Sequence, residues 1–320
     1  MPAHRLSPTS RTVRWGMFDA AYPPVLTIAS GESLTIETVS GGPEVMPPPE
    51  TGLAVPPALA AIHKAGLPRL SGHILILTGP IAVSGAEPGD MLEVRIERVE
   101  PGADWGYCAI RPLAGTLPED FPERFLSYIT VDRAQGTCRL PWGTELRLAP
   151  FFGVMGVAPP PEWGTISSIE PRAHGGNLDN KELGEGARLF LPVFVPGANF
   201  SAGDGHGVQG DGEVCVNALE MCLTGTFTLV LHKGGGARDP LLRYPRAETA
   251  THFVSMGMHE DLDVALKTAL REMIAFITGR TNLSRQQAYQ LCSLGVNFRI
   301  TQSVNREKGI HGLLSKHLLG

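Results

Sequence analysis

Alternating apolar and polar residues predict a series of β-strands in the first three quarters of the chain. In residues 33–39, apolar Leu34 and Ile36 alternate with polar side chains, which is the two-residue period of a half-buried strand. Comparable patterns predict further strands at 25–29, 91–99, 189–195, 224–232 and 297–303, and a pair of strands within 74–83. The chain is therefore expected to be rich in β-structure.

The pattern changes after residue 251, where a helical period replaces the alternation. Apolar residues recur every three or four positions across 261–278, which predicts an amphipathic helix. Ser284 and Gln287 have the spacing of a capping box, which predicts that a second helix covers 285–291.

Two segments show neither period. Residues 42–57 are rich in proline, and residues 140–165 are rich in proline, glycine and aromatic residues, so both are expected to form loops. The layout predicts an α+β fold that is mostly β, with sandwich-like or barrel-like sheets and a small C-terminal helical pair. We expect residues 1–320 to form a single domain, with two β-rich subdomains meeting near 150–200 as an alternative.

Composition excludes several classes of protein. The chain has 320 residues, of which 42% are hydrophobic, so it can bury a sizeable core. Its net charge of −5 and its lack of basic runs argue against nucleic acid or an anionic membrane as a partner. The N-terminus lacks the apolar core of a signal peptide, and no apolar stretch reaches the ~18 residues of a membrane span. We therefore expect a cytoplasmic protein.

The five cysteines form no C-x-x-C pair, which argues against a disulfide framework and against a cysteine-rich zinc site. Buried, inert thiols are the default expectation for all five. Cys215 lies two residues after Glu213, so a cysteine nucleophile stays open as an alternative, although no lysine is near it in the sequence.

A glycine-rich stretch, GDGHGVQGDGEV at 203–214, carries the strongest candidate chemistry. In an extended segment, Asp204 and His206 point to the same side because they are two residues apart. Asp211 and Glu213 form a second such pair, and the intervening glycines allow sharp turns that can bring both pairs around one cation. Aspartate with histidine suits zinc, whereas an all-oxygen set suits calcium or magnesium. A solvated surface turn is the alternative that this stretch alone leaves open.

Two further segments contain similar groups. HGGNLDNKEL at 174–183 places Asn177 and Asp179 on one face, again two residues apart. TGPIAVSGAEPGDMLEV at 78–94 follows His73 and contains a good turn sequence. Each segment is ordinary turn chemistry when taken alone.

Several common catalytic motifs are absent from the sequence. The chain has no G-x-S-x-G elbow, no H-E-x-x-H zinc helix and no P-loop. A G-x-G-x-x-G spacing occurs at 205–210, but no strand directly precedes it and no acidic residue stands about 20 positions later, so a dinucleotide site is discounted.

In their order along the chain, these segments resemble the acetamidase/formamidase family of amide hydrolases. The matching segments are TGPIAVSGAEPGD (78–90), GGNLDNKEL (175–183), GDGHGVQGDGEV (203–214) and FRITQSVN (298–305). The similarity extends from about residue 15 to about residue 311, which is nearly the whole chain. The chain departs from the family pattern at Ser84, where an acid is usual, at Gly207, where alanine is usual, and at Asn297, near which aspartate is common.

The resemblance implies a catalytic domain that hydrolyses a short-chain aliphatic amide, such as formamide or acetamide, to a carboxylate and ammonia. It also implies a divalent metal ion, with zinc expected and calcium as the alternative, and assembly as a homo-oligomer. Carried onto this chain, Asp204, His206 and Asp179 are the implied metal ligands.

The remaining roles follow from the same resemblance. Glu213 is the expected general base, and Glu220 is its alternate. Asn177 and the backbone N–H groups around Gly210 are expected to hold the oxyanion, and Gln209 is expected to contact the substrate.

The nature of the substrate pocket leaves alternatives open. Composition favours closure of a narrow pocket by aromatic residues, with Phe151, Phe152 or Trp163 as candidates. A non-catalytic β-rich binding protein on the same framework is one alternative, because Ser84 replaces an acid. An amidase for a larger or cyclic amide is the other.

Overall fold

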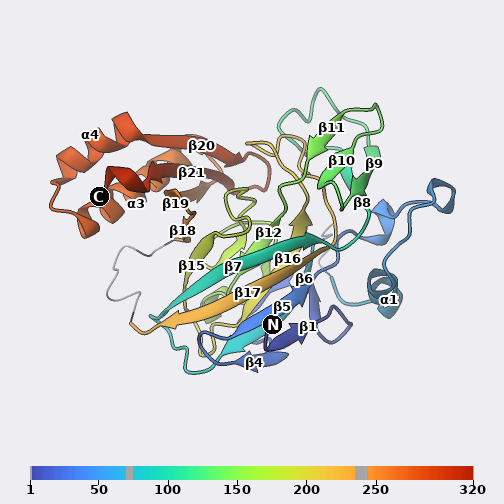
Figure 1. The fold of residues 1–320 in the computed structure, drawn as a ribbon, viewed down its shortest axis with the longest axis horizontal. Coiled ribbons are helices and arrows are strands. Elements are labelled where there is room, and N and C mark those ends of the chain that lie inside the picture. Colours follow the sequence, from blue (N-terminus) through green and yellow to red (C-terminus); the bar gives the residue numbers. More distant parts are fainter. Residues whose placement is uncertain (1, 70–74, 235–241, 243, 320) are drawn as a thin grey trace.

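The computed structural model describes residues 2–69, 75–234, 242 and 244–319, and its largest feature is a sheet that joins both ends of the chain (Figure 1). Among these residues the sheet has nine strands, in the order β1 (His4–Leu6), β5 (Ser33–Glu37), β17 (Leu223–His232), β7 (Met91–Pro101), β15 (Arg188–Pro192), β18 (Arg246–Glu248), β19 (His252–His259), β21 (Lys308–Ser315) and β20 (Val296–Gln302). Its strands pair antiparallel except for β1 and β5.

A second sheet packs face to face against the first. It contains β14 (Gly175–Asn177), β12 (Phe151–Gly156), β16 (Phe200–His206), β6 (Ile76–Val83) and β2 (Val13–Trp15) in that order, and β4 (Leu26–Ile28) also pairs with β6. Phe152 on β12 and Phe200 on β16 contact Phe227 on β17 of the first sheet, with ring centroids 5.3 and 6.0 Å apart. The predicted mostly β fold with sandwich-like sheets is confirmed.

Smaller elements surround this sandwich. A four-stranded sheet contains β11 (Glu145–Arg147), β10 (Thr137–Arg139), β9 (Phe125–Asp132) and β8 (Trp105–Ile110), and β13 (Ile166–Ser167) pairs with β3 (Met17–Phe18). The sequence analysis missed helix α1 (Pro57–Ala65). Short 3-10 helices lie at η1 (Pro43–Val45), η2 (Pro49–Thr51), η3 (Pro161–Trp163) and η4 (Lys316–Leu318).

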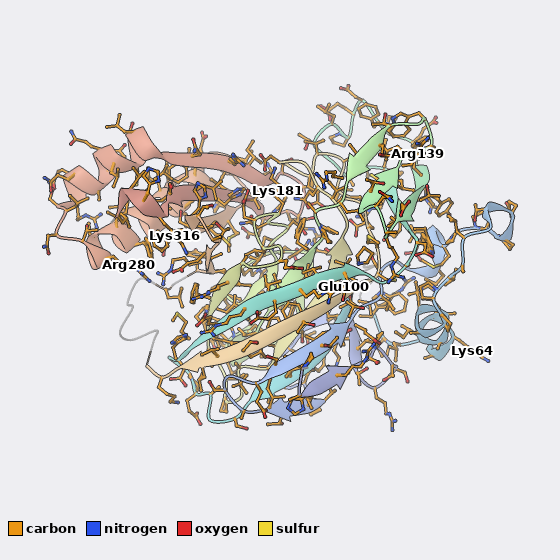
Figure 2. All side chains as sticks on the ribbon, in the orientation of Figure 1. Lys64, Glu100, Arg139, Lys181, Arg280 and Lys316 are labelled. Atoms are coloured by element: carbon orange, nitrogen blue, oxygen red, sulfur yellow. The ribbon has the colours of Figure 1, made fainter. Side chains whose placement is uncertain are left out.

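Both helices predicted near the C-terminus are present as α3 (Leu262–Arg280) and α4 (Arg285–Gly295). The Ser284 capping box is formed as expected. α3 packs closely on β19, where a Cβ atom added at Gly257 would lie 2.2 Å from the carbonyl oxygen of Ala265. Arg280, the last residue of α3, contacts Glu248 of β18 and ties the helical pair to the main sheet. Lys316, which directly follows β21, contacts the same glutamate, and both side chains are labelled in Figure 2.

The predicted strand pair within 74–83 is wrong for the residues from 75 onward, because β6 is one continuous buried strand. One of its edges pairs with β2 at Ile76–Thr78 and with β4 at Ile81–Val83. Pro80 therefore stands where the partner strand changes, a position at which its missing N–H group breaks no ladder. His73 lies outside the described residues.

The loop predicted for 140–165 is wrong in its centre, where β12 is a fully buried strand. Its sequence, FFGVMG, has no polar alternation because both of its faces are covered.

The largest apolar core cluster includes residues from Leu6 to Leu313. The division into one domain or two subdomains stays a prediction. Among the described residues, no helix is long and apolar enough to cross a membrane.

Candidate active site

Asp204 and His206 lie on the same face of β16, and both side chains are buried. β12 pairs with this strand, and its Gly153 lies beside the two side chains. A Cβ atom added at Gly153 would lie 2.5 Å from Asp179 Oδ1, 2.7 Å from Asp204 Oδ2 and 2.8 Å from His206 Cε1. Glycine is needed here because the neighbouring side chains occupy the space that a methyl group would take.

Asp179 reaches the same point from the turn after β14. Its φ is 44°, in the left-handed region, and its N–H donates to the carbonyl oxygen of Gly153 over 3.1 Å. Asp179 Oδ1 lies 3.8 Å from His206 Nε2, and Asn305 Nδ2 donates to Asp179 Oδ2. The second glycine-rich segment is thus brought against the first.

Two glutamates complete the cluster. Glu220 Oε1 lies 3.4 Å from His206 Nε2 and accepts hydrogen bonds from Asn217 Nδ2 (3.1 Å) and from the N–H of Ala218 (3.2 Å). Glu213 is buried and has a φ of 44°, which turns its side chain inward at the end of the glycine-rich stretch. The two glutamates therefore differ, since Glu220 is held in place by two donors from its own turn.

The cluster holds more polar atoms than its hydrogen bonds satisfy. Within the described part of the chain, the buried atoms without a hydrogen bond include Asn177 Oδ1, Asp179 Oδ1, Asp204 Oδ1, His206 Nε2, Glu213 Oε2 and Glu220 Oε2. Each such atom costs about 1–3 kcal/mol if nothing binds it. The cluster contains two overlapping groups of possible metal ligands, and within each group the ligand atoms all lie within 4.8 Å of one another. The first group is Asp179, His206 and Glu213, and the second is Asp204, His206 and Glu220. Carboxylate oxygens and an imidazole nitrogen this close can bind a metal ion.

Burial and mutual repulsion shift the pKa values of the cluster. Burial raises the pKa of Glu213 well above its usual range, and the carboxylates of Glu220 and Asp204 raise it further. Burial also raises the pKa of Asp179, and it raises the pKa of Glu220 to about 8. Burial alone would lower the pKa of His206, but the Glu220 and Asp204 carboxylates raise it to about 10. The cluster by itself therefore retains protons, which a divalent cation would displace on binding.

Gln209 fixes the orientation of the His206 ring. Its Nε2 donates to the carbonyl oxygen of Asp179 over 2.7 Å, so its Oε1 faces His206 Nδ1 at 2.9 Å. Because an amide oxygen can only accept, Nδ1 carries a proton. Nε2 then faces the carboxylates, 3.3 Å from Asp204 Oδ2. Metal-ligating histidines commonly donate their second N–H group in this way.

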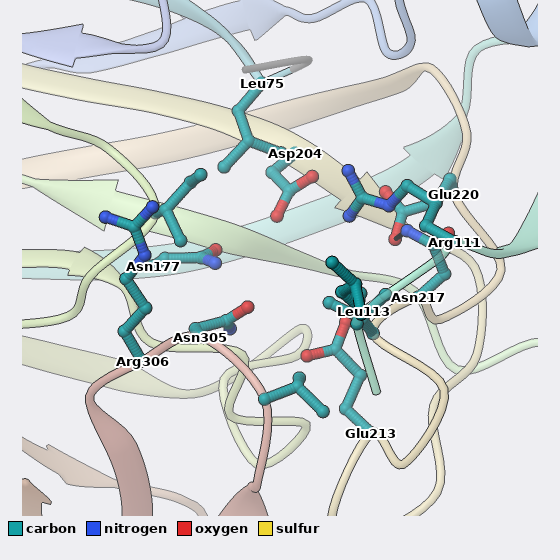
Figure 3. Close-up of a pocket in the computed structure, with 14 residues that line it drawn as sticks. Leu75, Arg111, Leu113, Asn177, Asp204, Glu213, Asn217, Glu220, Asn305 and Arg306 are labelled. Atoms are coloured by element: carbon teal, nitrogen blue, oxygen red, sulfur yellow. Dashed lines mark hydrogen bonds between the residues drawn. The ribbon is translucent and has the colours of Figure 1, made fainter. Parts of the chain in front are cut away.

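The cluster borders a cavity of 240 Å³, shown in Figure 3. Its polar lining consists of Arg111, Asn177, Asp204, Glu213, Asn217, Glu220, Asn305 and Arg306. Its apolar lining consists of Leu75, Leu113, Ala114, Ile169, Val216 and Val304. A cavity in which several polar groups converge beside apolar side chains can bind a small polar molecule.

Some residues singled out from the sequence lie outside this cavity. Gly210 is exposed and lines a separate pocket. Asp211 faces outward, with Oδ1 2.9 Å from Lys181 Nζ, so only Glu213 of the second acidic pair joins the cluster. The side chain of Gln209 supports His206 and is not part of the described cavity lining. Ser84, which stands where the family usually has an acidic residue, is exposed directly after β6 and is also not part of the described cavity lining.

The expected closure of the pocket by aromatic residues is wrong. Phe151 and Phe152 are fully buried in β12, and Phe151 packs edge-on against the His206 ring with centroids 5.1 Å apart. Trp163 packs against His174, with centroids 6.1 Å apart. Phe151 and Phe152 therefore stabilise the packed layers around the site. Composition alone cannot show whether an aromatic residue lies in such a layer or in the wall of a pocket.

Four polar residues of the described cavity lining were given no role from the sequence, namely Arg111, Asn217, Asn305 and Arg306. Asn305 is the last residue of the FRITQSVN segment, so its presence in a matching motif was the available signal. Asn217 precedes Glu220 by three residues and orients it. Arg111 follows β8 directly, and nothing in its sequence context marks it.

The fold and the site together define a class of protein. It is a β-sandwich in which one strand, β16, and the turns beside it hold a buried cluster of carboxylates and an imidazole next to a cavity of small-molecule size. A model of the acetamidase/formamidase family matches residues 19–165 and 163–311, and the chain belongs to this family.

Known proteins of similar sequence and structure agree with this membership. The chain is 31% identical over 205 residues to an acetamidase of Mycolicibacterium smegmatis, which covers 46% of this chain and 50% of the relative. It is 30% identical over 235 residues to a formamidase of Methylophilus methylotrophus, which covers 55% of this chain and 57% of the relative. The matches thus span about half the length of these relatives. A crystal structure of an acetamidase from Bacillus halodurans has a TM-score of 0.84 at 28% identity and covers 98% of each chain.

Proposed function

We propose that this protein hydrolyses a short-chain aliphatic amide, of the formamide or acetamide type, to a carboxylate and ammonia. The observation that carries the proposal is the convergence of Asp179, Asp204, Glu213, Glu220 and His206, with unpaired donor atoms, beside a cavity of 240 Å³. Membership of the acetamidase/formamidase family supports it, as do the names of the relatives.

Asp179, Asp204 and His206 would hold a divalent metal ion in this proposal. The mixture of carboxylate oxygens with an imidazole nitrogen favours zinc, and calcium is the alternative if only the carboxylates bind. A bound ion of this kind would supply a water molecule with a pKa lowered to roughly 7.

Glu213 would act as the general base. It lines the cavity, and its Oε2 atom has no hydrogen-bond partner, so this oxygen can take a proton from water and pass it to the leaving nitrogen. Glu220 is the alternate, but its Oε1 already accepts two hydrogen bonds, so we assign it to positioning.

Asn177 would hold the oxygen of the substrate carbonyl. It lines the cavity together with Asp204 and Glu213, and its amide can donate to an oxygen that gains charge in the reaction. The exposed position of Gly210 supports this side chain over the backbone N–H groups of that turn. Gln209 would act through His206, as the group that orients the ring.

The size of the cavity favours a second candidate, which is an amide with a longer or cyclic acyl group. A water molecule occupies about 30 Å³ in the liquid, so 240 Å³ exceeds what a molecule as small as formamide needs. The apolar wall that includes Leu75, Ile169 and Val304 would contact such an acyl group.

A panel of linear and cyclic amides, tested for ammonia release or ring opening, separates these candidates. We expect the purified protein to release ammonia from at least one linear amide. A protein that binds amides without hydrolysing any of them would instead be a non-catalytic binding protein on the same framework.

Assembly as a homo-oligomer belongs to the same proposal. Among the large apolar side chains exposed in and beside the four-stranded sheet are Phe125 (59%) and Trp142 (66%). Apolar surface of this kind supports contact with another subunit. Light scattering on the purified protein would give its molar mass, and a monomer would contradict this part.

A further inference from the structure

Cys108 and Cys215 form a pair of neighbouring thiols beside the candidate site. Their sulfur atoms are 3.5 Å apart, although the residues are 107 positions apart in the sequence. Both residues are half-buried, whereas Cys138, Cys222 and Cys292 are buried. The expectation that all five cysteines are buried is therefore wrong for this pair.

The thiol pair contacts the catalytic cluster through Asn217. Its carbonyl oxygen accepts hydrogen bonds from both thiols, at 3.9 Å from Cys108 Sγ and 3.5 Å from Cys215 Sγ. The side chain of Asn217 in turn donates to Glu220 Oε1 over 3.1 Å. Cys215 also lies two residues after Glu213, so a movement at the thiols displaces the segments that carry both glutamates.

The sulfur atoms can be reached without passing through the catalytic cavity. Cys215 lines an apolar pocket of 450 Å³ together with Leu117 and Phe121. Cys108 and Cys215 both line another pocket of 210 Å³. Neither cysteine belongs to the described lining of the cavity that contains Asp204, which argues against Cys215 as the nucleophile of the amidase.

We propose that Cys108 and Cys215 are a redox modification site that low-molecular-weight disulfides oxidise to an internal disulfide, with reversible loss of activity. The Cys215 sulfur, as the thiolate, attacks the small disulfide, forms a mixed disulfide and releases one thiol; Cys215 is the attacking residue because it lines both of these pockets. The Cys108 sulfur then attacks the Cys215 sulfur, closes the internal disulfide and releases a second thiol. Each cysteine loses one proton and one electron, and the small disulfide is reduced to two thiols.

Closure of the internal disulfide changes the catalytic cluster. The sulfur atoms must approach from 3.5 Å to about 2.05 Å, and the carbonyl oxygen of Asn217 loses both thiol donors. The turn between Glu213 and Asn217 is already strained, because Val216 is a β-branched residue with a φ of 70°. A misplacement of about 1 Å can cost on the order of 10²-fold in rate, so we expect at least a ~10-fold fall. The activity readout rests on the proposed amidase function.

The test treats the full-length, metal-loaded protein with oxidised glutathione and follows two readouts. Peptide mapping by mass spectrometry identifies disulfide-linked cysteines, and ammonia release measures activity on the best amide of the panel. We expect a Cys108–Cys215 linked peptide, a parallel fall in activity of at least ~10-fold, and recovery of both after dithiothreitol.

A double variant and a matched control separate this site from other thiols. The double variant Cys108→Ser and Cys215→Ser keeps a hydroxyl donor at each position for the Asn217 carbonyl oxygen. It should keep its basal activity and resist oxidised glutathione, whereas Cys138→Ser should remain as sensitive as the unmodified chain. Absence of the linked peptide from the unmodified chain would overturn the proposal even if the double variant fails to fold. A linked peptide without a change in rate would also overturn it. If no amide is hydrolysed before oxidation, the proposed function fails, and the peptide map alone decides whether the thiol pair forms a disulfide.

Discussion

The side-chain oxygen of Gln209 lies 2.9 Å from Nδ1 of His206 and determines which nitrogen of that ring faces the carboxylates. One short segment thus supplies both the imidazole and the group that orients it. The same amide donates to the carbonyl oxygen of Asp179, so Gln209 also joins the two glycine-rich segments. Gln209 therefore belongs to the site because it orients His206, although it is not part of the described cavity lining.

Replacing Gln209 should weaken metal binding. Gln209→Met keeps a side chain of similar length but removes the acceptor for Nδ1, so the ring loses its fixed orientation. Loss of such a supporting group typically lowers metal affinity by about 10–100-fold, measurable by zinc titration calorimetry. Gln135→Met, on an exposed turn, is the matched control. Equal zinc affinity in Gln209→Met and the unmodified chain would show that the ring needs no such support.

Gly153→Ala should disrupt the cluster from the neighbouring strand β12. The added methyl group would approach the oxygens of Asp179 and Asp204 to 2.5 and 2.7 Å. Overpacking of this kind costs about 1–3 kcal/mol, and it should also reduce bound metal. Gly210→Ala is the control, because no atom lies within 4 Å of its added Cβ atom. Thermal unfolding and metal analysis of both variants check this, and a Gly153→Ala protein with normal metal content would contradict the close contact between β12 and the cluster.

Glu213→Gln should remove proton transfer while leaving the fold in place. The expected loss in kcat is ~10²–10⁴-fold, because the amide cannot take up the water proton. Asp211→Asn, two residues earlier, should change the rate little, since it weakens only solvent-accessible ion pairs with Lys181 and Arg299. Steady-state ammonia release from both variants gives the comparison. A severe loss in Asp211→Asn with a mild one in Glu213→Gln would reverse the assignment of the two acids.

The metal-free protein should lose stability as the pH rises. Burial raises the pKa of Glu220 from 4.5 to about 8, with Asp204 adding to this shift and His206 opposing it. The pKa of His206 rises from 6.5 to about 10 because the Glu220 and Asp204 carboxylates outweigh burial. Both groups bind more protons in the folded state than in the unfolded state. Stability should therefore fall from about pH 4.5 to 8 through Glu220, and from about pH 6.5 to 10 through His206.

Thermal unfolding in the presence of a chelator checks this pH dependence. The Tm should decrease across the whole interval. Glu220→Gln should flatten the dependence in both halves, because it removes one titrating group and also the carboxylate that contributes most to the raised pKa of His206. The metal-loaded protein should show a weaker dependence, because metal binding displaces the protons. A Tm of the chelated protein that rises with pH would mean that these groups are not buried together.

The sequence predicted the sandwich-like strands and the helical pair well where one face of each element is polar. It failed for β12, which was predicted as a loop, because a strand that is buried on both faces shows no alternation. For β6 the strand structure was predicted, but Gly79 and Pro80 were wrongly taken as a break between two strands. Asp204 and His206 could be placed together because they share one strand. The outward direction of Asp211 could not be predicted, since it depends on the φ of 92° at Gly212 and on the contact with Lys181.

Contacts between segments that are distant in the sequence could not be predicted from its pattern either. Gly153 lies in a segment expected to be a loop, and its role follows only from the register between β12 and β16. The sulfur contact between Cys108 and Cys215 likewise depends on how β8 lies against the turn that ends at Glu220. Spacing along the chain carries no information about such pairs.

The central claim is that the buried cluster holds a divalent cation that amide hydrolysis requires. Elemental analysis of the purified protein, combined with ammonia release before and after chelation, tests it most directly. We expect about one tightly bound divalent ion per chain, loss of activity when the ion is removed, and recovery when zinc is restored. Full activity in protein shown to be free of metal would contradict the account.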